Sequence, residues 1–128
     1  VKLSGERLRL RVEHLREVII SACAQSGRTR LPALEAAASL EQGLRNGAQN
    51  AQPVLLMPGA SQSLAQAAHG QTALALAVGP EGGFDEREAA LASMLGFQAA
   101  HLGPRILRTE TAGLAAMAAL QAQAGDLA

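Results

Sequence analysis

The sequence is poor in aromatic side chains and in cysteine. It has no tryptophan or tyrosine, two phenylalanines and one cysteine, Cys23, among 128 residues. A single cysteine excludes a disulfide framework and a zinc site made of cysteines, and it favours a reducing, cytoplasmic setting. The hydrophobic residues, 48% of the chain, never form a run near the roughly 18 to 20 that a membrane span needs. We therefore expect a cytoplasmic protein without membrane contact, whose core consists of small aliphatic side chains.

The length is that of one domain. A chain of 128 residues buries enough surface to fold without a disulfide or a metal. No low-complexity linker divides it, so we expect a single domain over residues 1–128. Because the first residue is Val1 rather than methionine, we also expect a fragment of a longer protein.

The net charge is zero, but the charges are distributed unevenly. Residues 1–30 carry seven basic and three acidic side chains, which leaves the remainder with an excess of four acidic groups. Such a basic segment is consistent with a surface that binds a polyanion. It is equally consistent with a solvated helix face on which Arg and Glu side chains pair, so both interpretations stay open.

Hydrophobic spacing predicts one helix followed by alternating strands and helices. Apolar residues recur every three to four positions over residues 6–25, the spacing of an amphipathic helix. The run 73–78 is apolar on both faces, which is typical of a strand inside a parallel sheet that is covered on both sides. We expect helices at residues 6–25, 40–46, 61–68, 85–95 and 110–124, and strands at 34–36, 54–57, 73–78 and 98–102.

This order of elements predicts the fold class and the helix starts. Alternating strands and helices are typical of an α/β fold with a mostly parallel sheet flanked by helices. Ser39 with Gln42, and Asp85 with Glu88, have the spacing of capping pairs, and Ser61 is the expected cap of the helix between them.

Three loops that follow predicted strands have unusual residues. In open α/β sheets, ligands bind beyond the carboxyl ends of the strands, where loops lead into helices. The loops at that edge are residues 57–59, 79–84 and 103–109. The three glycines of the second loop let the backbone approach a ligand closely. A tight strand-to-helix turn also explains this loop, which matches neither the dinucleotide-binding nor the Walker fingerprint.

The third loop strengthens the case for a site. Residues 105–111 combine two arginines, a glutamate and two threonines with an Ile-Leu pair. Solvation alone does not require apolar residues in a loop, so we expect this pair to pack beneath another group. Helix initiation is the alternative, because Thr109 or Thr111 can cap the last helix and Glu110 suits its first turn.

Three stretches of the sequence resemble the signatures of one protein family. They are residues 24–32 (AQSGRTRLP), residues 78–84 (VGPEGGF) with Glu88 downstream, and residues 102–112 (LGPRILRTETA). With this order and spacing, essentially the whole chain resembles the RsmE family of small-subunit ribosomal RNA uridine N3-methyltransferases, which belongs to the SPOUT superfamily.

The resemblance implies a SPOUT-type α/β trefoil knot, in which the last loop and helix pass through the loop before them. It also implies a homodimer and a pocket in the knot for S-adenosylmethionine, which lies bent and is held mostly by backbone groups. The residues that the resemblance assigns to this cofactor are Leu56, Met57, Pro58, Gly59, Gly79, Pro80, Glu81, Gly82, Gly83, Leu102, Gly103, Ile106, Leu107 and Thr111.

The implied reaction is methyl transfer from S-adenosylmethionine to N3 of a uridine in 16S ribosomal RNA. Uracil N3–H is a weak acid, so a site must help to remove the proton or stabilise the resulting anion. Arg108 is the candidate for stabilising that charge. Glu110 is expected to orient Arg108 or to accept the proton, and Glu81 is the competing carboxylate.

The expected RNA-binding residues are Gln25, Arg28, Arg30 and Arg105, which can hold phosphate or the partner subunit. The alternative for Gln25, Arg28 and Arg30 is that they cap the end of the first predicted helix. The resemblance implies that family members begin with a β-rich RNA-binding domain similar to PUA or OB folds, followed by an opening strand and helix, and we expect this fragment to lack both. With two aromatic residues the chain offers no stacking platform for bases, so we expect RNA recognition to need that domain.

We expect no metal, because His14, His69 and His101 fall on different predicted elements. Cys23, on the apolar side of the first helix, is expected to be a buried, inert thiol. Two alternatives to a methyltransferase remain: a nucleotide- or phosphate-binding α/β module, and a non-catalytic dimerising domain that interacts with RNA.

Overall fold

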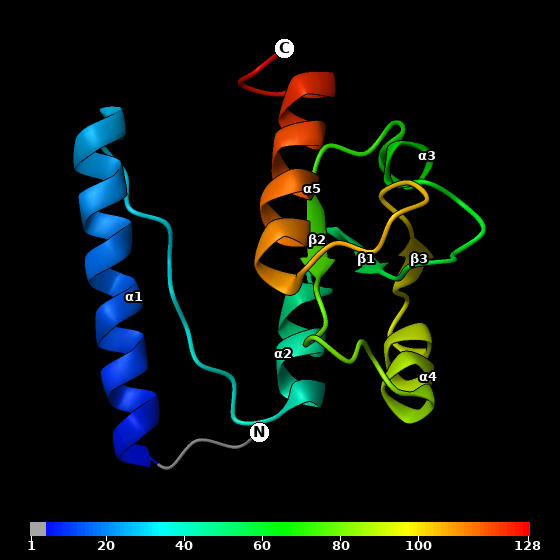
Figure 1. Ribbon diagram of the computed structural model, residues 1–128, viewed down its shortest axis with the longest axis horizontal. Helices are drawn as coiled ribbons and strands as arrows, with labels where there is room; N and C mark the ends of the chain where they lie inside the picture. The colour runs from blue at the N-terminus through cyan, green and yellow to red at the C-terminus, as the bar shows by residue number, and fades with distance from the viewer. Residues whose placement is uncertain (1–4) are drawn as a thin grey trace. The chain divides into compact units, whose positions relative to one another are not determined.

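The computed structural model describes residues 5–128, which form two compact units, one that ends at Ala38 and one that comprises Ser39–Ala128. The first contains helix α1 (Gly5–Ser26) and a segment without regular structure (Figure 1). The helix ends at Gly27, which takes a positive φ of 81° and lets the Arg28 N–H bond to the Cys23 carbonyl at 3.0 Å. The predicted first helix is therefore confirmed, and Cys23 is buried as expected.

The strand predicted at residues 34–36 is wrong. This segment is irregular, and no strand pairs with it among the described residues. Leu34 is half-buried, but its neighbours on both sides are exposed. A strand needs a neighbouring strand that pairs with its backbone N–H and C=O groups. These three residues have a weak strand pattern and no such neighbour among the described residues, so they stay irregular.

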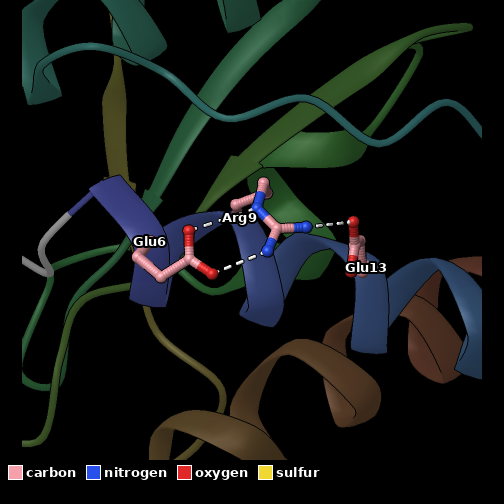
Figure 2. Close-up of polar contacts among 3 residues, drawn as sticks. All are labelled: Glu6, Arg9 and Glu13. Carbon is pink, nitrogen blue, oxygen red and sulfur yellow. Dashed lines mark hydrogen bonds and ion pairs between the residues drawn. The ribbon is translucent and has the colours of Figure 1, made fainter.

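Part of the charge on α1 is neutralised within the helix. Arg9 donates to Glu6 at 2.6 Å and to Glu13 at 2.7 Å, so one guanidinium joins two carboxylates along the helix face (Figure 2). The hydrogen bond that Arg9 donates to Glu6 and the attraction of Glu13 raise the pKa of Arg9 above its usual value. Arg9 therefore supports the interpretation of this face as a solvated, ion-paired surface.

The second unit is a three-layered α/β arrangement, with helices on both faces of a small parallel sheet (Figure 1). The strand order is β2-β1-β3, and Val54 of β1 pairs with Leu76 on one side and Gln98 on the other. This confirms the predicted parallel sheet flanked by helices. Its elements are α2 (Leu40–Gly47), β1 (Gln52–Leu56), α3 (Leu64–Ala68), β2 (Leu74–Ala77), α4 (Glu86–Met94), β3 (Gln98–Ala100) and α5 (Thr109–Ala124).

The interior strand is β1, not the strand near residues 73–78 as predicted. β2 lies at an edge of the sheet, and all four of its residues are half-buried. β1 is buried on both faces: Val54 and Leu56 contribute to the core under α3 and α5, and Leu55 contributes to the core under α2 and α4. Ala75 and Ala77 have small side chains that bury little apolar area, so this strand does not need a central position in the sheet. The pattern predicts an interior strand because alanine counts as apolar whatever its size.

Helix caps follow the predicted spacing with one shift. Asp85 and Glu88 form a complete capping box at the start of α4, and the Ser39 side chain accepts a hydrogen bond from the Gln42 N–H. The cap of α3 is Ser63 rather than Ser61, and Gln66 completes its box. The third strand ends at Ala100 instead of residue 102. No helix in the described part of the chain is long and apolar enough to cross a membrane.

Candidate functional site

A cavity of about 490 Å³ opens at the carboxyl ends of the three strands. Parallel strands bring these ends to one edge of the sheet, so the loops that follow them meet there. The volume falls within the range of about 300 to 1,000 Å³ that is usual for small-molecule sites. The cavity is lined by Leu56, Met57 and Pro58 after β1, by residues 78–84 after β2, and by Ala100, Leu102, Gly103, residues 105–109 and Ala112 from β3 to the start of α5.

Hydrogen bonds join the three loops to one another. The Met57 N–H donates to the Ala100 carbonyl at 2.9 Å, which links the end of β1 to the end of β3. The Thr109 hydroxyl donates to the Gly79 carbonyl at 2.9 Å, which links the start of α5 to the glycine loop after β2. The two bonds therefore connect β3 to the loop after β1, and the start of α5 to the loop after β2.

The glycine loop after β2 is folded back on itself. The Gly83 N–H bonds to the Pro80 carbonyl at 2.8 Å, and Gly83 has a φ of 77°, which favours glycine. The Phe84 ring packs over Gly79 so closely that a Cβ there would lie 3.1 Å from two ring carbons. Gly79 and Phe84 therefore form a compact base for this wall of the cavity.

Charged groups are exposed at the cavity. Arg105, Arg108 and Glu81 are lining residues with exposed side chains. Within residues 5–128, neither arginine has an ion-pair partner, so both guanidiniums are available to an anionic ligand. Ile106, between them, is 81% exposed, so the expectation that it packs beneath another group is wrong, whereas Leu107 is half-buried.

Most of the sequence-predicted cofactor residues line this one cavity, but six predicted site residues do not line it. Gly59 and Thr111 do not line the cavity, and Glu110 is an exposed residue of the first turn of α5. The four predicted RNA-binding residues are all exposed: Arg105 lines the cavity, whereas Gln25, Arg28 and Arg30 belong to the first compact unit.

The cavity is also lined by residues that were not among the expected cofactor-binding residues: Val78, Phe84, Ala100, Thr109 and Ala112. Thr109 is the most informative of them. Its proximity to the helix start suggested a capping role, but Arg108 occupies the N-cap position and the Thr109 hydroxyl bonds across to Gly79. Ala112 lies one turn further along α5, on the same side of the helix as Thr109.

The described residues contain no group of three or more His, Cys, Asp or Glu side chains that could hold a metal ion. His14 is on α1, His69 follows α3 and His101 follows β3. The cavity is lined by backbone groups, aliphatic side chains, the Phe84 ring, Thr109 and three exposed charged side chains.

The sequence matches the family model of the RNA methyltransferase domain over residues 1–121. The chain belongs to this family. It is 33% identical over 114 residues to the ribosomal RNA small subunit methyltransferase E of Buchnera aphidicola from Schizaphis graminum, an alignment that covers 89% of this chain and 46% of the relative. It is 36% identical over 121 residues to the methyltransferase of the same name from Mycobacterium bovis, covering 91% and 46%.

Two solved structures have the same fold. One is ribosomal RNA small subunit methyltransferase E of Neisseria gonorrhoeae bound to S-adenosylmethionine, with a TM-score of 0.87 and 38% identity over 95% of this chain and 52% of that one. The other, from Legionella pneumophila, is described as a methyltransferase with bound S-adenosylmethionine, with a TM-score of 0.89 and 37% identity over 98% and 52%. The chain spans about half the length of these relatives.

Proposed function

We propose that the chain is an S-adenosylmethionine-dependent methyltransferase domain that modifies N3 of a uridine in 16S ribosomal RNA. The observation that carries this proposal is that the second and third signature loops, which are far apart in the sequence, are hydrogen-bonded to each other around one cavity. Family membership and the names of the relatives support the reaction class.

The cavity suits the methyl donor in size and chemistry. Leu56, Met57 and Leu107 offer an aliphatic surface for a flat base, and the glycine loop offers backbone groups without side-chain obstruction. Glu81 supplies a negative charge that complements the sulfonium and ammonium groups. When bound, S-adenosylmethionine supplies an electrophilic methyl group.

The arginines suit the RNA side of the reaction. Loss of the N3 proton leaves negative charge spread over uracil O2 and O4, and the unpaired Arg108 guanidinium, at the cavity, can donate to either oxygen. Arg105 is placed to contact phosphate. Glu110, outside the cavity lining, orients Arg108 or accepts the proton, and Glu81 is the alternative acceptor.

The remaining architectural proposals concern the chain as a whole. We propose that residues 1–128 form one methyltransferase domain, that its last loop and helix are knotted through the preceding loop, and that an N-terminal RNA-binding domain contributes to RNA recognition. The Thr109–Gly79 hydrogen bond, between segments 30 residues apart, supports the knot because it brings the last helix against the loop after β2. Gln25, Arg28 and Arg30 then bind RNA or the partner subunit.

We also propose a homodimer that uses α5. Leu114 is 73% exposed and Met117 is 52% exposed, and their spacing of three residues aligns them on one side of the helix. Leu114→Arg is expected to convert the dimer into a monomer, because it introduces a charge into an apolar contact. Sedimentation velocity measures the change. An unchanged sedimentation coefficient for this variant would place the interface elsewhere.

Methyl-donor binding tests the central proposal. Isothermal titration calorimetry of the chain is expected to detect S-adenosylmethionine binding, with ATP and NAD giving none. Gly79→Ala should weaken that binding by about tenfold or more, because its Cβ displaces the Phe84 ring and overpacking costs about 1–3 kcal/mol.

Gly47→Ala is the matched control for this titration. It lies on α2, away from the cavity lining, and its Cβ would make an ordinary contact of 3.9 Å with Ala75. We expect it to bind the methyl donor with unchanged affinity. Absence of heat from a folded chain at millimolar S-adenosylmethionine would refute the proposal, and preference for ATP or NAD would favour a nucleotide-binding module.

A further inference from the structure

His101 belongs to none of the sequence motifs and takes no part in the proposed reaction, but its backbone and its imidazole both make specific hydrogen bonds. Its backbone is held by α3 and the segment before it: the His101 N–H donates to the Gln62 carbonyl at 3.0 Å, and the Leu64 N–H donates to the His101 carbonyl at 2.9 Å. These bonds form an isolated parallel bridge between Ser63 and His101. The imidazole therefore projects from a fixed point of the backbone, directly after β3.

The imidazole turns back onto the loop that follows it. His101 Nδ1 accepts a hydrogen bond from the Gly103 N–H at 3.0 Å, and Gly103 has a φ of 94°. Leu102, between them, packs against the core formed under α3 and α5. The side chain of Leu102 and the N–H of Gly103 are thus held by separate contacts, which together determine how the Leu102–Gly103 peptide is oriented.

This peptide separates two hollows. Leu102 and Gly103 line both the 490 Å³ cavity and a smaller one of about 250 Å³, whereas His101 lines only the smaller one. The N–H and C=O of a trans peptide point in opposite directions. Because the Gly103 N–H is directed at His101, the Leu102 carbonyl points away from the imidazole, which lines only the smaller cavity.

We propose that His101 is a positioning residue for methyl-donor binding. Its imidazole holds the Leu102–Gly103 peptide so that the Leu102 carbonyl is presented to the larger cavity as a fixed acceptor for an N–H group of the ligand. Without the hydrogen bond to His101 Nδ1, the flexible backbone at Gly103 lets the Leu102–Gly103 peptide rotate. The ligand then binds only the molecules in which the Leu102 carbonyl faces the cavity, which weakens the measured affinity. The inference rests on the proposed function, because it takes S-adenosylmethionine as the ligand.

Two substitutions separate the hydrogen bond from the bulk of the side chain. His101→Leu keeps an aliphatic side chain of similar reach and removes the acceptor. His101→Asn is smaller but keeps an acceptor, and an Asn side chain bonds readily to the N–H two residues further along. If the role were only to fill space, His101→Asn would be the more damaging change.

We expect His101→Leu to weaken S-adenosylmethionine binding by about three- to tenfold, the worth of one hydrogen bond, and His101→Asn to bind within about twofold of the wild type. Calorimetry measures the affinities. In the full-length protein at saturating methyl donor, the turnover number of His101→Leu should equal that of the wild type, because the effect is on binding. If His101→Leu does not fold, as judged by circular dichroism, His101→Ala takes its place.

Wild-type affinity for His101→Leu overturns the inference, as does an equal loss in both variants or a loss confined to the turnover number. These results differ from failure of the proposed function itself, in which the wild-type chain does not bind S-adenosylmethionine at all.

Discussion

Arg108→Ala in the full-length protein is expected to lower the turnover number for ribosomal RNA methylation by about 10²- to 10³-fold, the usual effect of removing one donor that stabilises developing charge. The guanidinium lines the cavity, is exposed and has no ion-pair partner in residues 5–128, so its positive charge is available to the uracil anion. Transfer of a labelled methyl group to small-subunit RNA under single-turnover conditions measures the rate. The affinity for S-adenosylmethionine should stay within about twofold, because we propose that backbone and aliphatic groups hold that ligand.

Arg105 provides the matched control. It has the same side chain, lines the same cavity and is also exposed, but we assign it to phosphate contact. Arg105→Ala should weaken RNA binding and reduce the salt dependence of that binding by about one counterion, with little change in the rate at saturating RNA. If Arg105→Ala abolishes turnover and Arg108→Ala only weakens RNA binding, the two assignments must be exchanged. If neither variant changes the rate, charge stabilisation comes from another group.

The sequence predicts the helices of both units well because local signals define where they begin and end. Asp85 with Glu88 marks the start of α4, and Gly27 and Gly96 follow the ends of helices, with positive φ values of 81° and 92°. These signals depend on residues a few positions apart, so one sequence is enough to recognise them. The segment at residues 34–36 lacks such a signal, and only a pairing strand would have made it extended.

Strand order and the contacts within the site are less predictable, because they depend on distant residues. Two apolar runs, around Val54 and Leu76, both suit a parallel sheet, and local pattern does not say which is central. Thr109 illustrates the same limit in the site. Its hydroxyl bonds to Gly79, a partner 30 residues away, and the local context favoured a helix cap instead. The residues of the cavity were largely identifiable from motifs, but the bonds that hold the loops together were not.

The second large expected effect is on the free energy of unfolding, and it follows from the position of β1 between two layers of helices. Leu55 is 3% exposed and packs in the core that contains Leu44, Ala92 and Phe97, on the opposite face of the sheet from Val54 and Leu56. Leu55→Ala leaves a void in a layer that the short strand cannot close. We expect the free energy of unfolding to fall by about 2–5 kcal/mol, the usual cost of such a truncation in a packed core.

Urea denaturation followed by far-UV circular dichroism measures this change, because a chain without tryptophan or tyrosine has no strong fluorescence probe. Met94→Ala is the control: Met94 is a large apolar residue of α4 that is 85% exposed, so its truncation should change the free energy of unfolding by no more than about 0.5 kcal/mol. Equal losses in the two variants would contradict a core that is centred on β1. β1 pairs with both other strands, and the loops at the ends of all three strands line the cavity. A large fall in the free energy of unfolding for Leu55→Ala alone therefore means that the part of the sheet carrying these loops depends on the core packed against β1.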